Sequence, residues 1–175
     1  MDLFSLQRQL SQFTEYPIEQ WQPPFCGPIP IRIDRDGSWF FHGSQIQRPE
    51  LVRLFAAVLS CDAGRYLLTT PSEQVQIEVA DAPFLLVEAQ WQEDGRLQLT
   101  TNLQQQFMVG AQYPVMLQAE PLTGQLLPYM QLPRGLSAKF SRALYYQLAE
   151  QAQRIQDTDS EHYVLQSGAY QFRIG

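Results

Sequence analysis

The chain has 175 residues and a formal net charge of −6 at pH 7, and Lys139 is its only lysine. About 45% of the residues are apolar and 12% are aromatic, which is typical of a folded globular protein and excludes a chain that is disordered throughout. Proteins that grip a phosphate backbone usually carry a surplus of Lys and Arg on one face. The composition therefore argues against partners such as nucleic acid polymers and anionic membranes.

Cys26 and Cys61 are far apart and lack the spacing of a metal site, so we expect two free thiols in a reducing compartment. Residues 1–13 include an early acid and several polar side chains, unlike a signal peptide. No apolar run approaches the ~20 residues of a membrane-spanning helix. We therefore expect a cytoplasmic protein with no membrane attachment.

The first half predicts a helix, a hairpin, a second helix and a second hairpin. Apolar residues recur three and four positions apart over residues 2–13, which indicates a short amphipathic helix. After a proline-rich stretch, residues 31–43 predict a hairpin that turns at Gly37, because glycine adopts a positive φ at little cost. Pro49 suits the first turn of the next helix, and strands follow at residues 65–70 and 74–80.

The second half predicts mainly strands and one long helix. Strands are expected at residues 84–91, 96–102, 107–109 and 115–119, followed by a hairpin around Gly124 and a last hairpin at residues 163–174. The helix is the longest expected in the chain, with one apolar face consisting of Leu136, Phe140, Leu144, Leu148, Ala152 and Ile155. Antiparallel strands with a packed helix in each half predict an α+β fold.

The same unit occurs twice. Residues 162–174 align without a gap on residues 65–77, so that Tyr66 matches Tyr163 and Ile77 matches Ile174. A helical pattern precedes each copy, and a strand–turn–strand pattern around a glycine precedes each helix. We therefore predict an internal duplication of a hairpin–helix–hairpin unit, with a boundary at Asp81-Ala82-Pro83 that separates domains 1–82 and 83–175, and one crevice between the halves.

The chain also resembles the bacterial family of domain of unknown function 1285. The family pattern joins an "I-x-R-x-G-x-W-x-x-x-G-x-P-I-x-R" stretch, a helix, a "Y-x-L-x-T-P-x-E" stretch and a "D-A-P-F" close. The residues that match it are Gly37, Trp39, Gly43, Ile46, Arg48, Tyr66, Thr70, Pro71, Glu73, Asp81, Ala82, Pro83 and Phe84; later matches include Asn102, Arg134, Arg142, Tyr145, Ser167 and Gly168. The sequence departs from the pattern at Gln45, where proline is common, and at Tyr113, which replaces a histidine.

The resemblance implies two α+β domains, of which the C-terminal one is similar to a pleckstrin-homology-like barrel. It also implies an interdomain site for a nucleotide-like ligand and a link to signal transduction, and it brings no established activity.

Candidate ligand-binding residues come from both the residues themselves and the resemblance. Phosphate-cradling glycine motifs are absent, so a nucleotide-like or anionic ligand needs arginines, which bind phosphate through two N–H groups at once. His42 has the chemistry for acid–base work beside a carboxylate. The full set of candidates is Trp39, His42, Arg48, Tyr66, Thr70, Glu73, Asn102, Arg134 and Arg142.

Each candidate also has a structural interpretation: a core aromatic, a solvated arginine, or a polar side chain that caps a turn. The two histidines fall in different halves, so no metal site or cofactor is expected. The leading hypothesis is a non-catalytic binding or regulatory protein. The alternatives are a hydrolase that uses His42 or Glu73 in the same crevice, and a scaffold that binds a protein partner along a strand edge.

Overall fold

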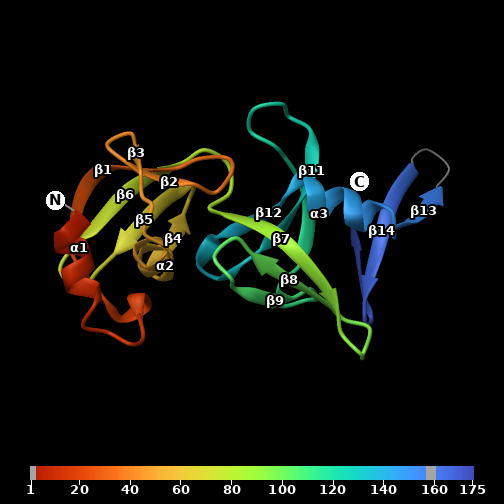
Figure 1. Cartoon of the computed structure of the whole chain (residues 1–175), viewed down its shortest axis with the longest axis horizontal. Coiled ribbons are helices and arrows are strands. Elements are labelled where there is room, and N and C mark those ends of the chain that lie inside the picture. Colours follow the sequence, from red (N-terminus) through yellow and green to blue (C-terminus); the bar gives the residue numbers. More distant parts are fainter. Residues whose placement is uncertain (1–2, 157–160) are drawn as a thin grey trace. The chain divides into compact units, whose positions relative to one another are not determined.

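The computed structural model describes residues 3–156 and 161–175 (Figure 1). The chain folds into two compact units, Met1–Ala80 and Asp81–Gly175, which we call the N-terminal unit and the C-terminal unit. Helices and sheets are present in both units, so the predicted α+β class is confirmed.

The N-terminal unit is built on a six-stranded sheet with the strand order β3-β2-β1-β6-β5-β4. The central strands β1 and β6 are parallel, and the other neighbours are antiparallel. The elements in chain order are α1 (Leu3–Leu10), η1 (Ile18–Gln20), β1 (Phe25–Ile33), β2 (Trp39–Phe41), β3 (Ser44–Gln45), α2 (Pro49–Ala57), β4 (Leu59–Asp62), β5 (Arg65–Thr69) and β6 (Gln74–Val79).

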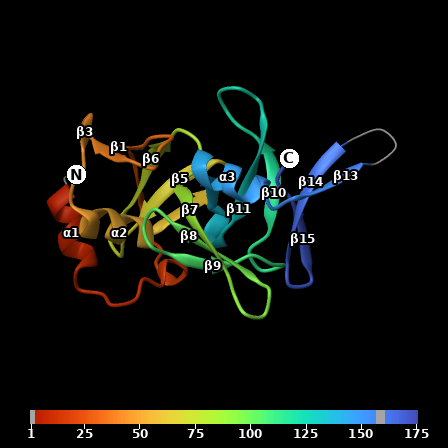
Figure 2. The same ribbon diagram turned by 45° about the vertical axis from the view of Figure 1, so that its right-hand side comes forward.

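One face of this sheet carries the core of the unit. Ile31 and Ile33 of β1 are buried, whereas Arg32 between them is exposed, because successive strand side chains point to opposite faces. The ring of Trp39 lies 6.3 Å from that of Phe55 in α2. Helices α1 and α2 lie next to each other against the core (Figures 1 and 2). Arg32 therefore belongs to the opposite, helix-free face.

The C-terminal unit contains a second six-stranded sheet, with the order β10-β11-β12-β7-β8-β9, and a three-stranded sheet, β13-β14-β15. Helix α3 packs against β7. The elements are β7 (Phe84–Trp91), β8 (Leu97–Thr101), β9 (Gln106–Met108), β10 (Val115–Ala119), β11 (Leu126–Gln131), η2 (Pro133–Gly135), β12 (Ser137–Phe140), α3 (Arg142–Ala149), β13 (Gln153–Gln156), β14 (Glu161–Ser167) and β15 (Tyr170–Arg173).

The two six-stranded sheets have the same topology. In each, two three-stranded meanders are joined because the first and sixth strands pair in parallel: β1 with β6, and β7 with β12. The predicted similarity of the two domains is therefore confirmed. The predicted repeat unit is wrong in the second half, because strands β7–β12, and not a unit that ends with the hairpin at residues 163–174, correspond to strands β1–β6.

The gapless match that suggested the repeat still has a physical basis. Leu68 faces Val75 across the β5–β6 hairpin, and their matched residues Leu165 and Phe172 face each other across β14–β15. Both hairpins therefore share one register of buried cross-strand pairs. They occupy different places in the fold, since β14–β15 belongs to the three-stranded sheet.

The long helix predicted in the second half is wrong in its extent. Ser137–Phe140 forms β12, with Ala138 and Phe140 buried, and α3 begins only after Ser141, whose hydroxyl accepts a hydrogen bond from the Leu144 amide at 3.2 Å. Leu136, Phe140 and Leu144 are four residues apart, and that spacing fits a helical face and also the alternation of a strand. Residues 137–140 form a strand because they pair with β11 and with β7, which lies far away in the sequence.

The pleckstrin-homology-like barrel implied by the resemblance is not confirmed. The strands that the structure describes in the C-terminal unit form two open sheets with no closed barrel. None of the helices traced within residues 3–156 and 161–175 has both the length and the hydropathy that a membrane span requires.

Candidate functional site

Several candidate residues of the N-terminal unit have structural partners. Trp39 is only 1% exposed in the core. Tyr66 is half-buried on β5, opposite Ile77. The guanidinium carbon of Arg48, at the N-cap of α2, lies 5.8 Å from the centre of the Phe4 ring, within cation–π range. These contacts within the chain explain the positions of the three side chains, and no ligand is needed to explain them.

Thr70 and Glu73 are brought together in one turn and bind the helix α1. The Thr70 hydroxyl donates to Gln9 Oε1 at 2.8 Å, and Gln9 Nε2 donates to Glu73 Oε1 at 2.9 Å. The Glu73 carboxylate, a predicted ligand-binding group, thus accepts from a neutral side chain of the chain itself.

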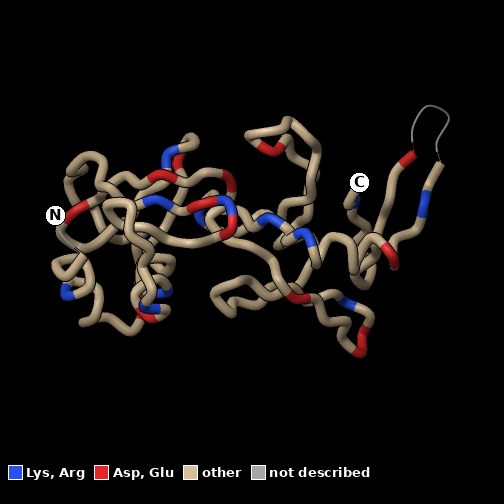
Figure 3. Tube along the Cα trace, turned by 45° about the horizontal axis from the view of Figure 1, so that its top comes forward, with Lys and Arg blue, Asp and Glu red and all other residues tan. Residues whose placement is uncertain are grey.

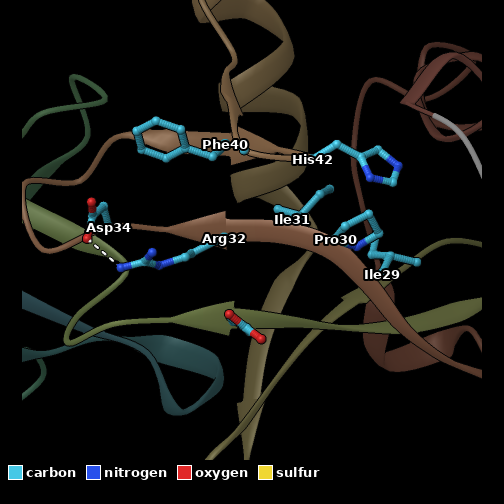
Figure 4. A pocket seen from close by; sticks show the side chains of 9 residues that line it. Ile29, Pro30, Ile31, Arg32, Asp34, Phe40 and His42 are labelled. Atoms are coloured by element: carbon cyan, nitrogen blue, oxygen red, sulfur yellow. Dashed lines mark hydrogen bonds and ion pairs between the residues drawn. The ribbon is translucent and has the colours of Figure 1, made fainter.

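His42 lines a pocket on the helix-free face of the first sheet, which we call the β1 pocket (Figure 4). Its volume is about 390 Å³. The lining residues are Ile29, Pro30, Ile31, Arg32, Asp34, Phe40, His42, Gly43 and Glu78.

The β1 pocket contains an acid, a base and an arginine, but these groups do not converge. Arg32 is hydrogen-bonded to Asp34 at 3.0 Å, and Figure 4 shows His42 at the opposite end of the pocket from Asp34. His42 has a φ of 48° and Gly43 a φ of 78°, as expected for the two central residues of a tight hairpin turn. The position of His42 thus follows from the β2–β3 turn.

In the C-terminal unit, Asn102 and Arg134 occupy backbone-defining positions. The Asn102 side-chain oxygen accepts from the backbone amide of Leu85 at 3.1 Å. The backbone amide of Asn102 donates to the Leu85 carbonyl at 2.8 Å. Arg134 has a φ of 62° within the turn that precedes β12. Asn102 therefore fastens the loop after β8 to the start of β7, and Arg134 shapes the approach to β12.

Arg142 lines a second pocket, which we call the α3 pocket. It has a volume of about 370 Å³, within the range of about 300–1,000 Å³ usual for small-molecule sites. Its walls come from β11, β12 and the first turns of α3. The lining residues are Gln125, Leu127, Pro128, Lys139, Phe140, Arg142, Tyr145 and Tyr146.

Arg142 places a positive charge at the α3 pocket. Arg142 is the first residue of α3, and the first turn of this helix contains no acid. The first N–H groups of a helix lack partners within it, and they give this end a partial positive charge. Ser141 satisfies the Leu144 amide, and the two preceding residues of the helix, Arg142 and Ala143, are exposed. By contrast, α2 has Glu50 in its first turn.

Aromatic rings adjoin these cationic groups. The guanidinium carbon of Arg142 lies 5.7 Å from the centre of the Tyr146 ring, and the rings of Tyr145 and Tyr146 are 5.6 Å apart. Tyr146 is 54% exposed, so its ring is accessible for stacking. The pocket therefore combines groups that bind an anion with groups that bind a flat ring.

Behind the pocket, Lys139 is held in a polar cluster. Its ammonium nitrogen lies 2.6 Å from Asp81 Oδ2 and 3.7 Å from Glu120 Oε1, and both acidic side chains are almost fully buried. Tyr129, which faces Lys139 across β11–β12, donates its hydroxyl to Asp81 at 2.8 Å. Glu120 also accepts from the amide and hydroxyl of Thr123, at 2.8 and 2.7 Å. The cluster thus joins the start of β7 to the β10–β11 hairpin.

Two exposed carboxyl groups of the C-terminal unit have shifted pKa values. A hydrogen bond from the Tyr163 hydroxyl, and then one from Arg154, lowers the pKa of the exposed Glu161 carboxyl. The backbone amide of Arg96 and then its side chain lower the pKa of Asp94. Neither carboxyl lines the β1 pocket or the α3 pocket, so these shifts reflect local surface pairs.

Sequence reasoning identified Arg142 but missed the residues around it. Lys139 could have been noticed as the only lysine of the chain, and it alternates with the apolar Ala138 and Phe140 as a strand residue does. No sequence pattern indicated Tyr146 as a pocket residue, because the exposure of its side chain depends on where α3 begins. Among the described residues, no three His, Cys, Asp or Glu side chains lie close enough to bind a metal ion.

Comparison with known families covers almost the whole chain. Residues 16–82 match "Domain of unknown function (DUF1285), N-terminal domain", and residues 83–174 match "Protein of unknown function (DUF1285), C-terminal domain". The chain therefore belongs to the DUF1285 family, as its motifs predicted. No curated protein matches it.

Two solved structures are similar to the chain. A crystal structure of a DUF1285 family protein from Silicibacter pomeroyi DSS-3 has a TM-score of 0.85 and 35% sequence identity, over 99% of this chain and 94% of that chain. A DUF1285 family protein from Shewanella baltica OS155 has a TM-score of 0.58 and 29% identity, over 70% of this chain and 91% of that one.

Proposed function

We propose that this DUF1285 family protein is a non-catalytic binding protein of the cytoplasm, whose ligand is a small nucleotide-like anion in the α3 pocket. Its occupancy would report the concentration of that ligand, which is a regulatory role of the kind expected in signal transduction. The free thiols of Cys26 and Cys61 support a reducing compartment. The crevice expected between the two halves stays a prediction, and the proposal rests on one unit alone.

The observation that carries the proposal is the charge at the start of α3. A cation in the first turn of a helix opposes the helix dipole, whereas an anion there is stabilised by it. Arg142 at the first position therefore costs stability in the free protein, and a bound phosphate would convert this cost into attraction. Arginine binds phosphate through two parallel N–H groups, and Lys139 faces the same pocket.

The tyrosines support the nucleotide-like part of the ligand. A simple inorganic anion would leave the exposed ring of Tyr146 unused, whereas a base or similar flat ring would cover it. Stacking of a base on an aromatic side chain contributes about 1–3 kcal/mol. The ligand chemistry that fits the whole pocket is therefore a phosphate joined to a planar ring.

The test is isothermal titration and thermal shift of the whole chain with three probes: a nucleoside monophosphate panel, the matching nucleosides, and pyrophosphate. The monophosphates are expected to bind most tightly, because only they use both halves of the pocket. At 100 times its dissociation constant, a ligand stabilises the fold by about 2.7 kcal/mol. If none of the probes binds, or if nucleosides bind as well as nucleotides, the proposal is wrong.

Replacing Arg142 by Ala is expected to weaken nucleotide binding by about 1.5–3 kcal/mol, the range for hydrogen bonds to charged groups. The melting temperature should not fall, because Arg142 is exposed and opposes the helix dipole. The matched control is Arg96→Ala, which removes an exposed arginine that is paired with Asp94 outside the pocket. Equal affinities for the two variants would contradict the site.

The chain is expected not to bind duplex DNA at physiological salt. Its net charge is −6 with a single lysine, and Figure 3 shows basic and acidic residues interspersed along the trace of each unit. Binding through phosphates needs several neighbouring cations, and it weakens steeply as salt is added. Tight binding in a fluorescence anisotropy titration, with that salt dependence, would overturn this expectation.

A further inference from the structure

The turn formed by Thr70, Pro71, Ser72 and Glu73, which we call the Thr70–Glu73 turn, holds a side chain from a distant part of the sequence. Gln9 of α1 contacts it through both ends of its carboxamide: the oxygen accepts from the Thr70 hydroxyl at 2.8 Å, and the nitrogen donates to the Glu73 carboxylate at 2.9 Å. An ionised carboxylate can only accept hydrogen bonds. The pair of contacts therefore selects a group with an acceptor and a donor side by side, as a primary carboxamide has.

The turn is organised without Gln9. The Thr70 amide donates to the Glu73 carbonyl at 2.9 Å, and the Thr70 hydroxyl accepts from the Glu73 amide at 3.1 Å and from the Ser72 amide at 3.3 Å. The hydroxyl also has the Glu73 carbonyl at 3.1 Å as an alternative acceptor. Removal of Gln9 would thus leave the hydroxyl bonded and the turn intact, so the site exists before its occupant arrives.

Helix α1 resembles a docked segment more than an integral element of the N-terminal unit. It has eight residues, whereas isolated helices shorter than about 12–15 residues are marginal in water, so its order depends on docking. Its buried contacts are those of Leu6 and Leu10. Helix α1 lies before the segment that matches the N-terminal domain of the family, which begins at residue 16. Residues 11–24 connect the helix to β1.

We propose that the Thr70–Glu73 turn and the adjoining apolar surface form a recognition site for an amphipathic helix that carries a glutamine beside apolar residues. In this chain α1 fills the site, with Gln9 between Leu6 and Leu10 as the recognised pattern. This site is separate from the α3 pocket, and its assignment does not depend on the proposed ligand.

Two measurements on the full chain test the site. In hydrogen exchange, the amides of α1 are expected to open independently of the sheet, and Gln9→Ala should speed their exchange about tenfold or more while β5 and β6 keep their rates. In the second measurement, a labelled peptide with the sequence of residues 1–15 is titrated onto the Gln9→Ala chain. It should bind about tenfold or more tightly than the same peptide carrying Gln9→Ala.

The acceptor is tested by Glu73→Ala, which should abolish the difference between the two peptides. Its matched control is Glu78→Ala, which removes an exposed carboxylate of β6 and should preserve the difference. Three outcomes would overturn the proposal: no binding of either peptide, equal binding of both to the Gln9→Ala chain, or exchange of α1 only together with the whole N-terminal unit.

Discussion

Replacement of Lys139 by Met is expected to lower the free energy of unfolding of the C-terminal unit by about 3–5 kcal/mol. The change removes the cation between Asp81 and Glu120, whose side chains are 3% and 2% exposed, and a buried pair that loses one partner leaves an uncompensated charge in the interior. The free energy would be measured by urea titration, with tryptophan fluorescence and circular dichroism as independent probes of the transition.

The control for this effect is Arg154→Met, which breaks an exposed pair with Glu161 and should cost less than about 1 kcal/mol. The double change Lys139→Met with Asp81→Asn should recover part of the loss, because the second substitution removes one of the two stranded charges. A loss below 1 kcal/mol for Lys139→Met would show that the cluster contributes little to the stability of the fold.

Replacement of Phe55 by Ala is expected to destabilise the N-terminal unit by about 3–5 kcal/mol, the range for large-to-small changes of buried aromatic residues. Phe55 is fully buried, and its ring lies beside that of Trp39, so truncation leaves a cavity between α2 and the sheet. Leu144→Ala in α3, where Leu144 is 1% exposed, should cost about 2–5 kcal/mol for the same reason.

The matched control for Phe55 is Phe25→Ala, because Phe25 is 52% exposed at the start of β1. It should cost less than about 1 kcal/mol in the same titration. If the two phenylalanine variants unfold at the same urea concentration, the packing of α2 described above is not what stabilises this unit.

Local patterns predicted most strands and the helix α2 correctly. The strand predicted at residues 84–91 is β7, with the same limits, and Pro49 begins α2 as its position predicted. The strands β4, β12 and β13 were missed. They are four residues long each, and their sequences follow or continue a helical spacing, so that pairing partners far along the chain decide their structure.

The candidate site could be predicted only in part, because a pocket depends on where elements meet. Arg142 was among the predicted candidates, but only the strand that contains Lys139 and the helix that starts after Ser141 bring both residues into the lining of the α3 pocket. Thr70 and Glu73, both predicted candidates, share one turn. Their partner Gln9 lies 64 positions from Glu73 in the sequence, and nothing local indicates such a contact.

The parallel pairing of first and last strands sets an order for folding during synthesis. Phe25 of β1 pairs with Gln74, and Phe84 of β7 pairs with Ala138, so each sheet is completed by a contact across roughly fifty residues. Such distant contacts slow folding, because a long loop must close before they form. On the ribosome, β1 must wait for β6 to emerge, whereas the hairpins β1–β2 and β4–β5 can form earlier. The first sheet can be complete before most of the second has been made, which keeps two topologically identical sets of strands from exchanging partners.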